Sequence, residues 1–314
     1  MNARALLAAL FVASIAAAVA CSDRSRALVA SPLPSVPPSS CEGCHAAIAA
    51  EWQASFHRSA FSDETFQRSL ALEETKEHAF CTRCHAPAAE RAGVAVGVDC
   101  TSCHVTPHAE RAAGTAVCAT CHEFTFDDGR PELVQKTVSE HAASAYAGVG
   151  CAQCHMPSRD GHKDHRFLAG HAPGQIARAV HVEVARSHER DPTNALRVAI
   201  HVDAGHAFPT GDMFRRARLL VFAEGATGAI VADAERIFGR TWAGVRGGAH
   251  ESARTQVSDS RILGAWHEVI ALDEPSVPIV RVRWSLVYER VVAVRGPHVS
   301  MASSDVIAEG TVSW

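Results

Sequence analysis

Five pentapeptides of the form Cys-x-x-Cys-His recur in the first half of the chain. They are CEGCH at 41–45, CTRCH at 81–85, CTSCH at 100–104, CATCH at 118–122 and CAQCH at 151–155. With 19 histidines in 314 residues, a histidine would follow all five cysteine pairs by chance about one time in a million. The fifth position is therefore part of the chemistry.

Two thiols at this spacing can add to the two vinyl groups of a haem, and the adjoining histidine then lies beneath the ring, where its imidazole binds the iron. The motifs therefore predict five covalently bound haem c groups. The predicted attachment residues are Cys41, Cys44, Cys81, Cys84, Cys100, Cys103, Cys118, Cys121, Cys151 and Cys154. The predicted proximal iron ligands are His45, His85, His104, His122 and His155.

Three other uses of paired cysteines fit the pattern less well. Structural zinc would combine two Cys-x-x-Cys pairs per ion, which leaves one of five unmatched and needs no histidine at a fixed place. Thioredoxin-like pairs occur singly, beside a strand and helix unit, and no such unit precedes these motifs. Disulfides closed across two residues are strained and rarely repeated.

The motifs are dense along the chain. The 115 residues from Cys41 to His155 leave about 23 residues for each haem, too few for a separate protein shell around each group. Neighbouring haems are therefore expected to touch or nearly touch. Their large apolar rings would also explain why aromatic residues make up only 6% of a chain that is 47% hydrophobic.

The remaining histidines decide whether each iron has a second axial ligand. The favoured distal ligands are His57, His165, His206, His141 and His108. His57 follows the first motif in EWQASFH, and His206 stands in AGHAFPTGD, a loop with Gly and Pro among apparent strands. His162 shares one helical face or tight loop with His165, which the DHRF context favours.

Other histidines are weaker candidates. His78 and His171 are possible substitutes. We expect the others to be surface or strand histidines: His181, His188, His201, His250, His267 and His298. We do not expect Met156, which adjoins His155, to be a ligand.

The axial ligands separate two functions. If every iron has two histidines, the protein is an electron carrier that passes electrons between redox partner proteins, without a catalytic residue. The alternative is a terminal reductase of a small nitrogen compound or other oxyanion at one five-coordinate haem. We favour the carrier.

The N-terminus predicts export. A short basic start is followed by an apolar run from Ala5 to Ala20, which predicts a signal peptide over residues 1–20. Ala18-Val19-Ala20 also fits ordinary signal cleavage at the same bond, but Cys21 is the one cysteine outside the motifs, so we favour a lipid on it. A Ser- and Pro-rich tether is expected over 21–40. This predicts a periplasmic or outer-membrane lipoprotein of a Gram-negative-type bacterium. The net charge of -4 argues against nucleic acid as a partner.

The elements that would hold these residues change type along the chain. Helical patterns cover 46–61, 63–80 and 131–147. β-branched, partly alternating runs cover 181–188, 195–204, 216–225, 229–239, 267–274 and 278–294. We therefore predict an α+β chain. A mainly α pentahaem domain over 41–175 precedes an antiparallel, β-sandwich-like domain over 176–314. We expect the second domain to pack over the haems and contribute His206, in preference to the alternative that it docks a partner protein.

Several segments resemble a known family. CEGCH with EWQASFH, FCTRCHAP, GVDCTSCHV, CATCHEF, CAQCHMP and DHRF are similar to the multihaem cytochrome c superfamily. That superfamily includes the tetrahaem cytochrome c of ammonia oxidation, hydroxylamine oxidoreductase and the pentahaem nitrite reductase. GHAFPTG resembles an element in the C-terminal β regions of this group.

The resemblance implies closely packed, largely bis-histidine haems and periplasmic electron transfer, with His57 and His165 at positions of distal ligands. Two features of catalytic members are not seen. The chain has no Cys-x-x-Cys-Lys motif, and its two tyrosines, Tyr146 and Tyr288, give no obvious cross-link position. Both departures favour the carrier over the reductase.

Overall fold

The structure is a computed structural model. It describes residues 41–89, 96–104, 114–125, 133–188, 194–211, 214–244, 253–272, 275, 277–295 and 298–314. All of them belong to one compact unit, Pro37–Trp314. The predicted signal peptide, Cys21 and the tether lie outside the described residues, as does His108. None of the described helices is long and apolar enough to cross a membrane.

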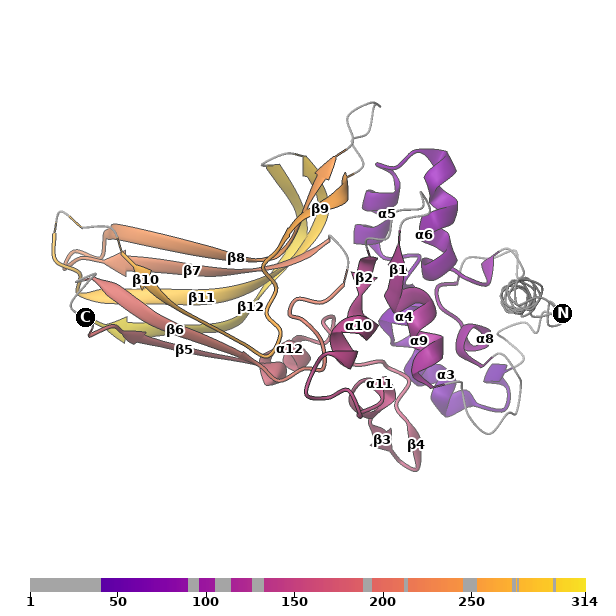
Figure 1. Cartoon of the computed structure of the whole chain (residues 1–314). Helices are drawn as coiled ribbons and strands as arrows, with labels where there is room; N and C mark the ends of the chain where they lie inside the picture. The colour runs from indigo at the N-terminus through magenta and orange to yellow at the C-terminus, as the bar shows by residue number, and fades with distance from the viewer. Residues whose placement is uncertain are drawn as a thin grey trace, which may run out of the picture. The chain divides into compact units, whose positions relative to one another are not determined.

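The part of the chain that contains the cysteine motifs consists mainly of short helices (Figure 1). They are α3 (Ala46–Gln53), α4 (Phe56–Ser59), α5 (Glu64–Leu70), the 3-10 helix η2 (Thr75–Glu77), α6 (His78–His85), α8 (Cys100–Cys103), α9 (Thr115–His122), α10 (Thr137–Ala142), α11 (Cys151–His155) and α12 (Pro173–Ala179). Two small hairpins lie among them: β1 (Glu123–Thr125) with β2 (Leu133–Lys136), and β3 (Ser158–Arg159) with β4 (His162–Lys163).

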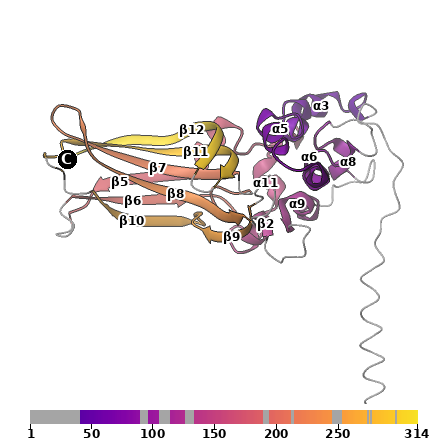
Figure 2. The ribbon, with the colours of Figure 1, turned by 90° about the horizontal axis from the view of Figure 1, so that it is seen from above.

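From Val180 onward the regular elements are long antiparallel strands. They are β5 (Val180–Arg186), β6 (Ala195–Val202), β7 (Arg215–Glu224), β8 (Ile230–Gly244), β9 (Ala253–Asp259), β10 (Ala265–Ala271), β11 (Arg281–Arg295) and β12 (His298–Ser313). One sheet has the order β10-β6-β5 and the other β12-β11-β7-β8-β9. Figure 2 shows the two sheets as two layers. The α+β class is thus confirmed, whereas the division into two domains at residue 175 stays a prediction.

The two sheets bury a shared apolar core. Alternate residues of β7 point inward, Ala217, Leu219 and Val221, because side chains alternate between the faces of a strand. They join Leu196 from β6 and Leu286 from β11 in one cluster. Among the described residues, every large apolar side chain less than 2% exposed belongs to this part of the chain.

The helical region has few buried apolar side chains of its own. Its described buried apolar residues are Ala49, Trp52, Ala60, Leu70, Ala86, Ala88 and Val134, four of them alanines. Such a region has little apolar surface to bury by itself, as expected where large prosthetic groups supply the core.

Several elements differ from the sequence prediction. The helix predicted over 63–80 is interrupted between α5, which ends at Leu70, and η2, which begins at Thr75. A helix across 131–147 is wrong for Leu133–Lys136, which forms β2 and pairs with β1. The side chain of Arg240 donates to the backbone carbonyls of Leu133 and Val134, so tertiary contacts fix this segment as a strand. Strands β9 and β12 were not predicted, because their exposed polar residues hide the apolar alternation.

Candidate haem centres

Each motif lies in a short helical turn, and its histidine follows the second cysteine at or near the end of that turn. α6, α9 and α11 end at His85, His122 and His155. Asp99 caps α8, because its carboxylate accepts a bond of 3.0 Å from the backbone N–H of Ser102. Two cysteines three residues apart in such a turn lie on one face, as attachment to one ring requires.

Thiols from different motifs lie against one another, and all ten described cysteines are free. The thiol of Cys84 lies beside that of Cys121, Cys41 beside Cys100, and Cys118 beside Cys151, close enough for the neighbour to raise the pKa of Cys84, Cys100 and Cys118. Burial, and also the nearby Cys118 and Cys121, raise the pKa of Cys103 to about 11. The fourth motif therefore lies next to the second, third and fifth, and the first next to the third.

Three of the predicted distal histidines lie opposite motif histidines. The ring centres of His57 and His122 are 6.4 Å apart. Those of His165 and His104 are 6.3 Å apart. Those of His206 and His155 are 6.1 Å apart. Each pair joins residues distant in the sequence.

These separations test whether the residues fit a haem iron. Two imidazoles on opposite sides of one metal ion, each nitrogen about 2 Å from the metal and about 1.2 Å from its ring centre, have ring centres about 6.4 Å apart. The three pairs match this value, so they fit an iron with two axial histidines. The described residues contain no group of three or more His, Cys, Asp or Glu side chains that could hold a bare metal ion.

Hydrogen bonds orient the rings for the same task. Nδ1 of His85 lies 2.9 Å from the carbonyl oxygen of Ala60. Nδ1 of His155 lies 2.8 Å from the carbonyl oxygen of Leu168, and Nδ1 of His165 lies 2.7 Å from that of Lys163. Nδ1 of His206 lies 3.2 Å from its neighbour's carbonyl. A carbonyl only accepts, so each Nδ1 carries the proton and Nε2 keeps the lone pair that binds a metal.

Burial favours the neutral imidazoles that metal binding needs. It lowers the pKa of His57 to about 4, with a further contribution from His122 and His155. Burial likewise lowers the pKa of His206 to about 4 and lowers that of His104.

Contacts of Glu51 distinguish the roles of His162 and His165. Its Oε1 lies 3.1 Å from Nε2 of His162, and its Oε2 accepts a bond of 2.9 Å from the backbone N–H of His165. His162 therefore directs Nε2 to a carboxylate, whereas His165 is held with its ring opposite His104. No feature of the local sequence indicates this role of Glu51.

The other predicted histidines have different surroundings. His141 packs against Gly205, where an added Cβ would lie 2.7 Å from the imidazole Cδ2, and no described ring contact pairs it with a motif histidine. His78 places Nε2 3.3 Å from the carbonyl of Glu73. His171 stacks on Phe56 at 3.4 Å and lines a cavity of about 400 Å³ with two arginines, Arg215 and Arg290. The roles of all distal ligands, His141 and His108 included, stay predictions.

Three further residues support the ligands. Phe66 stacks on the ring of His85 with centres 3.8 Å apart. Phe167 meets the ring of His57 edge-on at 4.3 Å. Gly97 lies against the backbone of His57 with φ of +83°, a conformation that favours glycine.

Residues 40–105 match the family model "Cytochrome c554 and c-prime". The crystal structure of a penta-heme cytochrome c552 from Thermochromatium tepidum is similar, with a TM-score of 0.70 and 18% sequence identity over 90% of this chain and 99% of that chain. MtrC from Shewanella baltica OS185 aligns with a TM-score of 0.17 and 16% identity over 81% of this chain and 44% of that one, which carries no argument about the fold. No curated protein matches the sequence. The first two findings confirm the resemblance to the multihaem cytochromes c.

Proposed function

We propose that this chain, which has the motifs and fold of a multihaem cytochrome c, binds five haem c groups covalently and passes electrons between redox partner proteins. The observation that carries the proposal is the set of three histidine pairs at 6.1 to 6.4 Å, each with one member from a Cys-x-x-Cys-His motif. A bound haem supplies one-electron chemistry at its iron.

The protein's own residues perform three tasks. The motif cysteines tether each ring, so that a short segment of chain can hold it. At the three described pairs, the motif histidine and its partner would hold an iron between them, which would leave no coordination position for a substrate there. The contacts between Cys84 and Cys121, and between Cys118 and Cys151, support rings close enough for electrons to pass from one to the next.

The arrangement of the chain gives the sheets a part in this function. We propose a haem-binding domain over 41–175 and a β domain over 176–314. His206 supports this, because it comes from the β part of the sequence and faces His155 of the last motif. The β domain would therefore complete one haem site rather than fold as an unrelated appendage.

The location is a proposal from the sequence of the N-terminus. We propose export by residues 1–20 and lipid attachment at Cys21, which would hold the haems at the periplasmic side of a membrane. Radiolabelled fatty acid should be incorporated by the wild type and not by Cys21→Ala, while both are exported. Equal labelling of the two proteins would contradict the lipid assignment.

The test of the function is spectroscopic. We expect the protein, matured in a host that attaches haem c, to give only low-spin signals by electron paramagnetic resonance. His57→Ala should convert one haem to a high-spin, carbon monoxide-binding form, and His267→Ala, at an exposed strand histidine, should convert none. A wild-type protein with a high-spin iron that binds small oxyanions would instead favour the reductase.

A further inference from the structure

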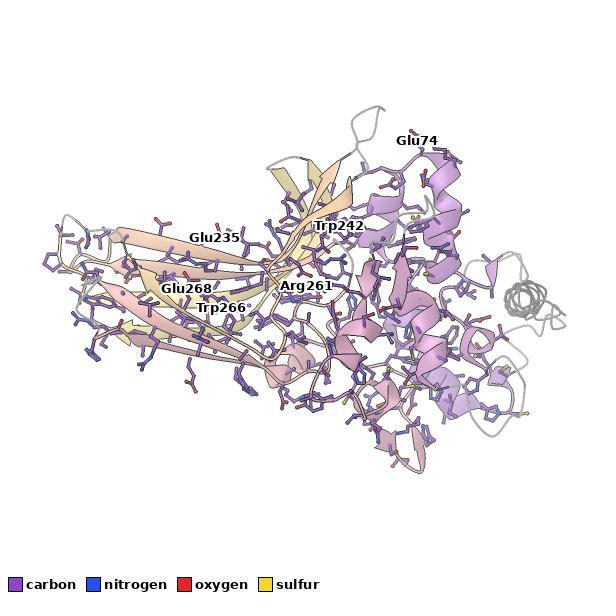
Figure 3. All side chains as sticks on the ribbon, viewed as in Figure 1. Glu74, Glu235, Trp242, Arg261, Trp266 and Glu268 are labelled. Carbon is purple, nitrogen blue, oxygen red and sulfur yellow. The ribbon has the colours of Figure 1, made fainter. Side chains whose placement is uncertain are left out.

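A group of charged side chains, with Arg261 and Glu140 buried and Lys136 and Asp259 partly exposed, joins the helical region to the sheets. The guanidinium of Arg261 donates to Asp259 through Nε at 2.9 Å and through Nη2 at 2.9 Å. Its Nη2 also donates to Glu140 of α10. Lys136 adds a second cation, 2.8 Å from Asp259. Figure 3 shows Arg261 near the ends of the long strands, on the side of α10.

This group is tied to the segment that carries His206. The other oxygen of Glu140 accepts bonds from the backbone N–H of Ala207 at 3.1 Å and from the hydroxyl of Thr210 at 3.4 Å. Ile262, which follows Arg261, pairs with Phe208 through backbone bonds of 2.7 and 2.9 Å. Arg261 is thus held beside the loop whose imidazole faces His155.

One donor of Arg261 has no acceptor. The side chain is only 3% exposed, and its Nη1 is buried without a hydrogen-bond partner in the part of the chain that the structure describes. A buried charged donor left without a partner is strongly unfavourable. Asp259 and Glu140 already engage Nε and Nη2, so the acceptor for Nη1 must come from another group.

Resting on the proposed function, we propose that Nη1 of Arg261 donates a hydrogen bond to a propionate of the haem held between His155 and His206. A carboxylate is the group that a guanidinium binds best. The two cations and two carboxylates of the group cancel in formal charge, so they would not draw a free anion into a buried position. A haem propionate differs from a free anion, because covalent attachment of its ring to the motif at 151–155 would hold it near Arg261.

The test is Arg261→Lys in the fully matured protein, because lysine keeps the cation beside Asp259 and Glu140 but has no second nitrogen on the far side. The bond to Nη1 offsets propionate charge near the iron. Its loss should lower the midpoint potential of one haem at pH 7 and shift one propionate band in the infrared difference spectrum. His206→Met should perturb the signal of the same haem. The control Arg236→Lys, at a partly exposed ion pair with Glu268, should shift neither.

The outcomes distinguish this proposal from the proposed function. Five attached haems with unchanged potentials and propionate bands in Arg261→Lys would overturn the role of Arg261 alone. A chain that carries no covalent haem would overturn the function itself. If the variant does not fold, a crystal structure of the wild-type protein with its haems decides: a propionate oxygen within hydrogen-bond distance of Nη1 supports the proposal, and a water there overturns it.

Discussion

Glu51→Ala should free an axial coordination position on the iron that His104 is proposed to bind, because it removes the contact that holds His165. The carboxylate of Glu51 accepts the hydrogen bond from the backbone N–H of His165, at 2.9 Å, and it also faces Nε2 of His162 at 3.1 Å. Its side chain is 19% exposed, so water screens these contacts only partly. The N–H of His165 lowers the pKa of Glu51, which keeps the carboxylate ionised at neutral pH.

The size of the effect follows from the bond that is lost. A hydrogen bond to a charged group contributes about 1.5 to 3 kcal/mol, and each 1.4 kcal/mol is a factor of about ten in an equilibrium. Losing the bond that holds His165 should therefore raise the fraction of protein with this ligand detached by about ten- to a hundredfold. Glu51→Gln keeps an acceptor and should give a smaller rise.

Carbon monoxide measures this fraction, because it binds a reduced haem only when an axial position is open. The rate of binding to the reduced protein should rise in Glu51→Ala and stay at the wild-type value in Glu64→Ala, an exposed carboxylate on α5. Equal rates for the wild type and Glu51→Ala, with no new high-spin signal, would refute the positioning role of Glu51.

Three further changes test other parts of the account. Gly97→Ala places a Cβ 2.4 Å from the carbonyl of His57 at a φ of +83°, so it should displace this ligand and give one high-spin haem; an unchanged spin state would contradict the assignment. Bonds from Arg166 lower the pKa of Asp164 to about 2 from 3.8, so its stabilisation is complete above pH 4 and is lost as the pH falls towards 2. Denaturant titrations should therefore show Asp164→Asn less stable than the wild type at pH 7 and the two converging near pH 2, whereas a constant difference would exclude this ion pair. Leu286→Ala, in the core between the sheets, should cost about 2 to 5 kcal/mol of unfolding free energy, seen as a lower melting temperature; no change would contradict the shared core.

The cysteines and proximal histidines of the candidate site could all be predicted from the sequence, because attachment of one haem requires them within five consecutive residues. The sequence predicted most strands from Val180 onward, since the apolar face of a half-buried strand repeats every second residue. It missed β12, whose exposed polar residues weaken that repeat. It also misassigned Leu133–Lys136, where pairing with β1 and bonds from Arg240 override helical propensity.

The pairing of ligands could not be derived in this way. His57 faces His122, and His165 faces His104, only because the helices bring distant segments together. His206 was easier to identify, because Gly and Pro around it predict a rigid loop. Glu51 and Arg261 have no sequence signal at all. Their roles depend on what they contact in the folded chain, and an ordinary helical glutamate or loop arginine has the same local sequence.

The most direct test of the account is the intact mass of the chain after export from a host that attaches haem c. The account predicts a mature polypeptide heavier by five haem groups, which remain bound after denaturation because thioether bonds hold them. Replacing both cysteines of one motif, Cys118 and Cys121, by serine should remove one of the five. A wild-type chain with the mass of the bare polypeptide would contradict the haem sites, the pairing of their ligands and the proposed function together.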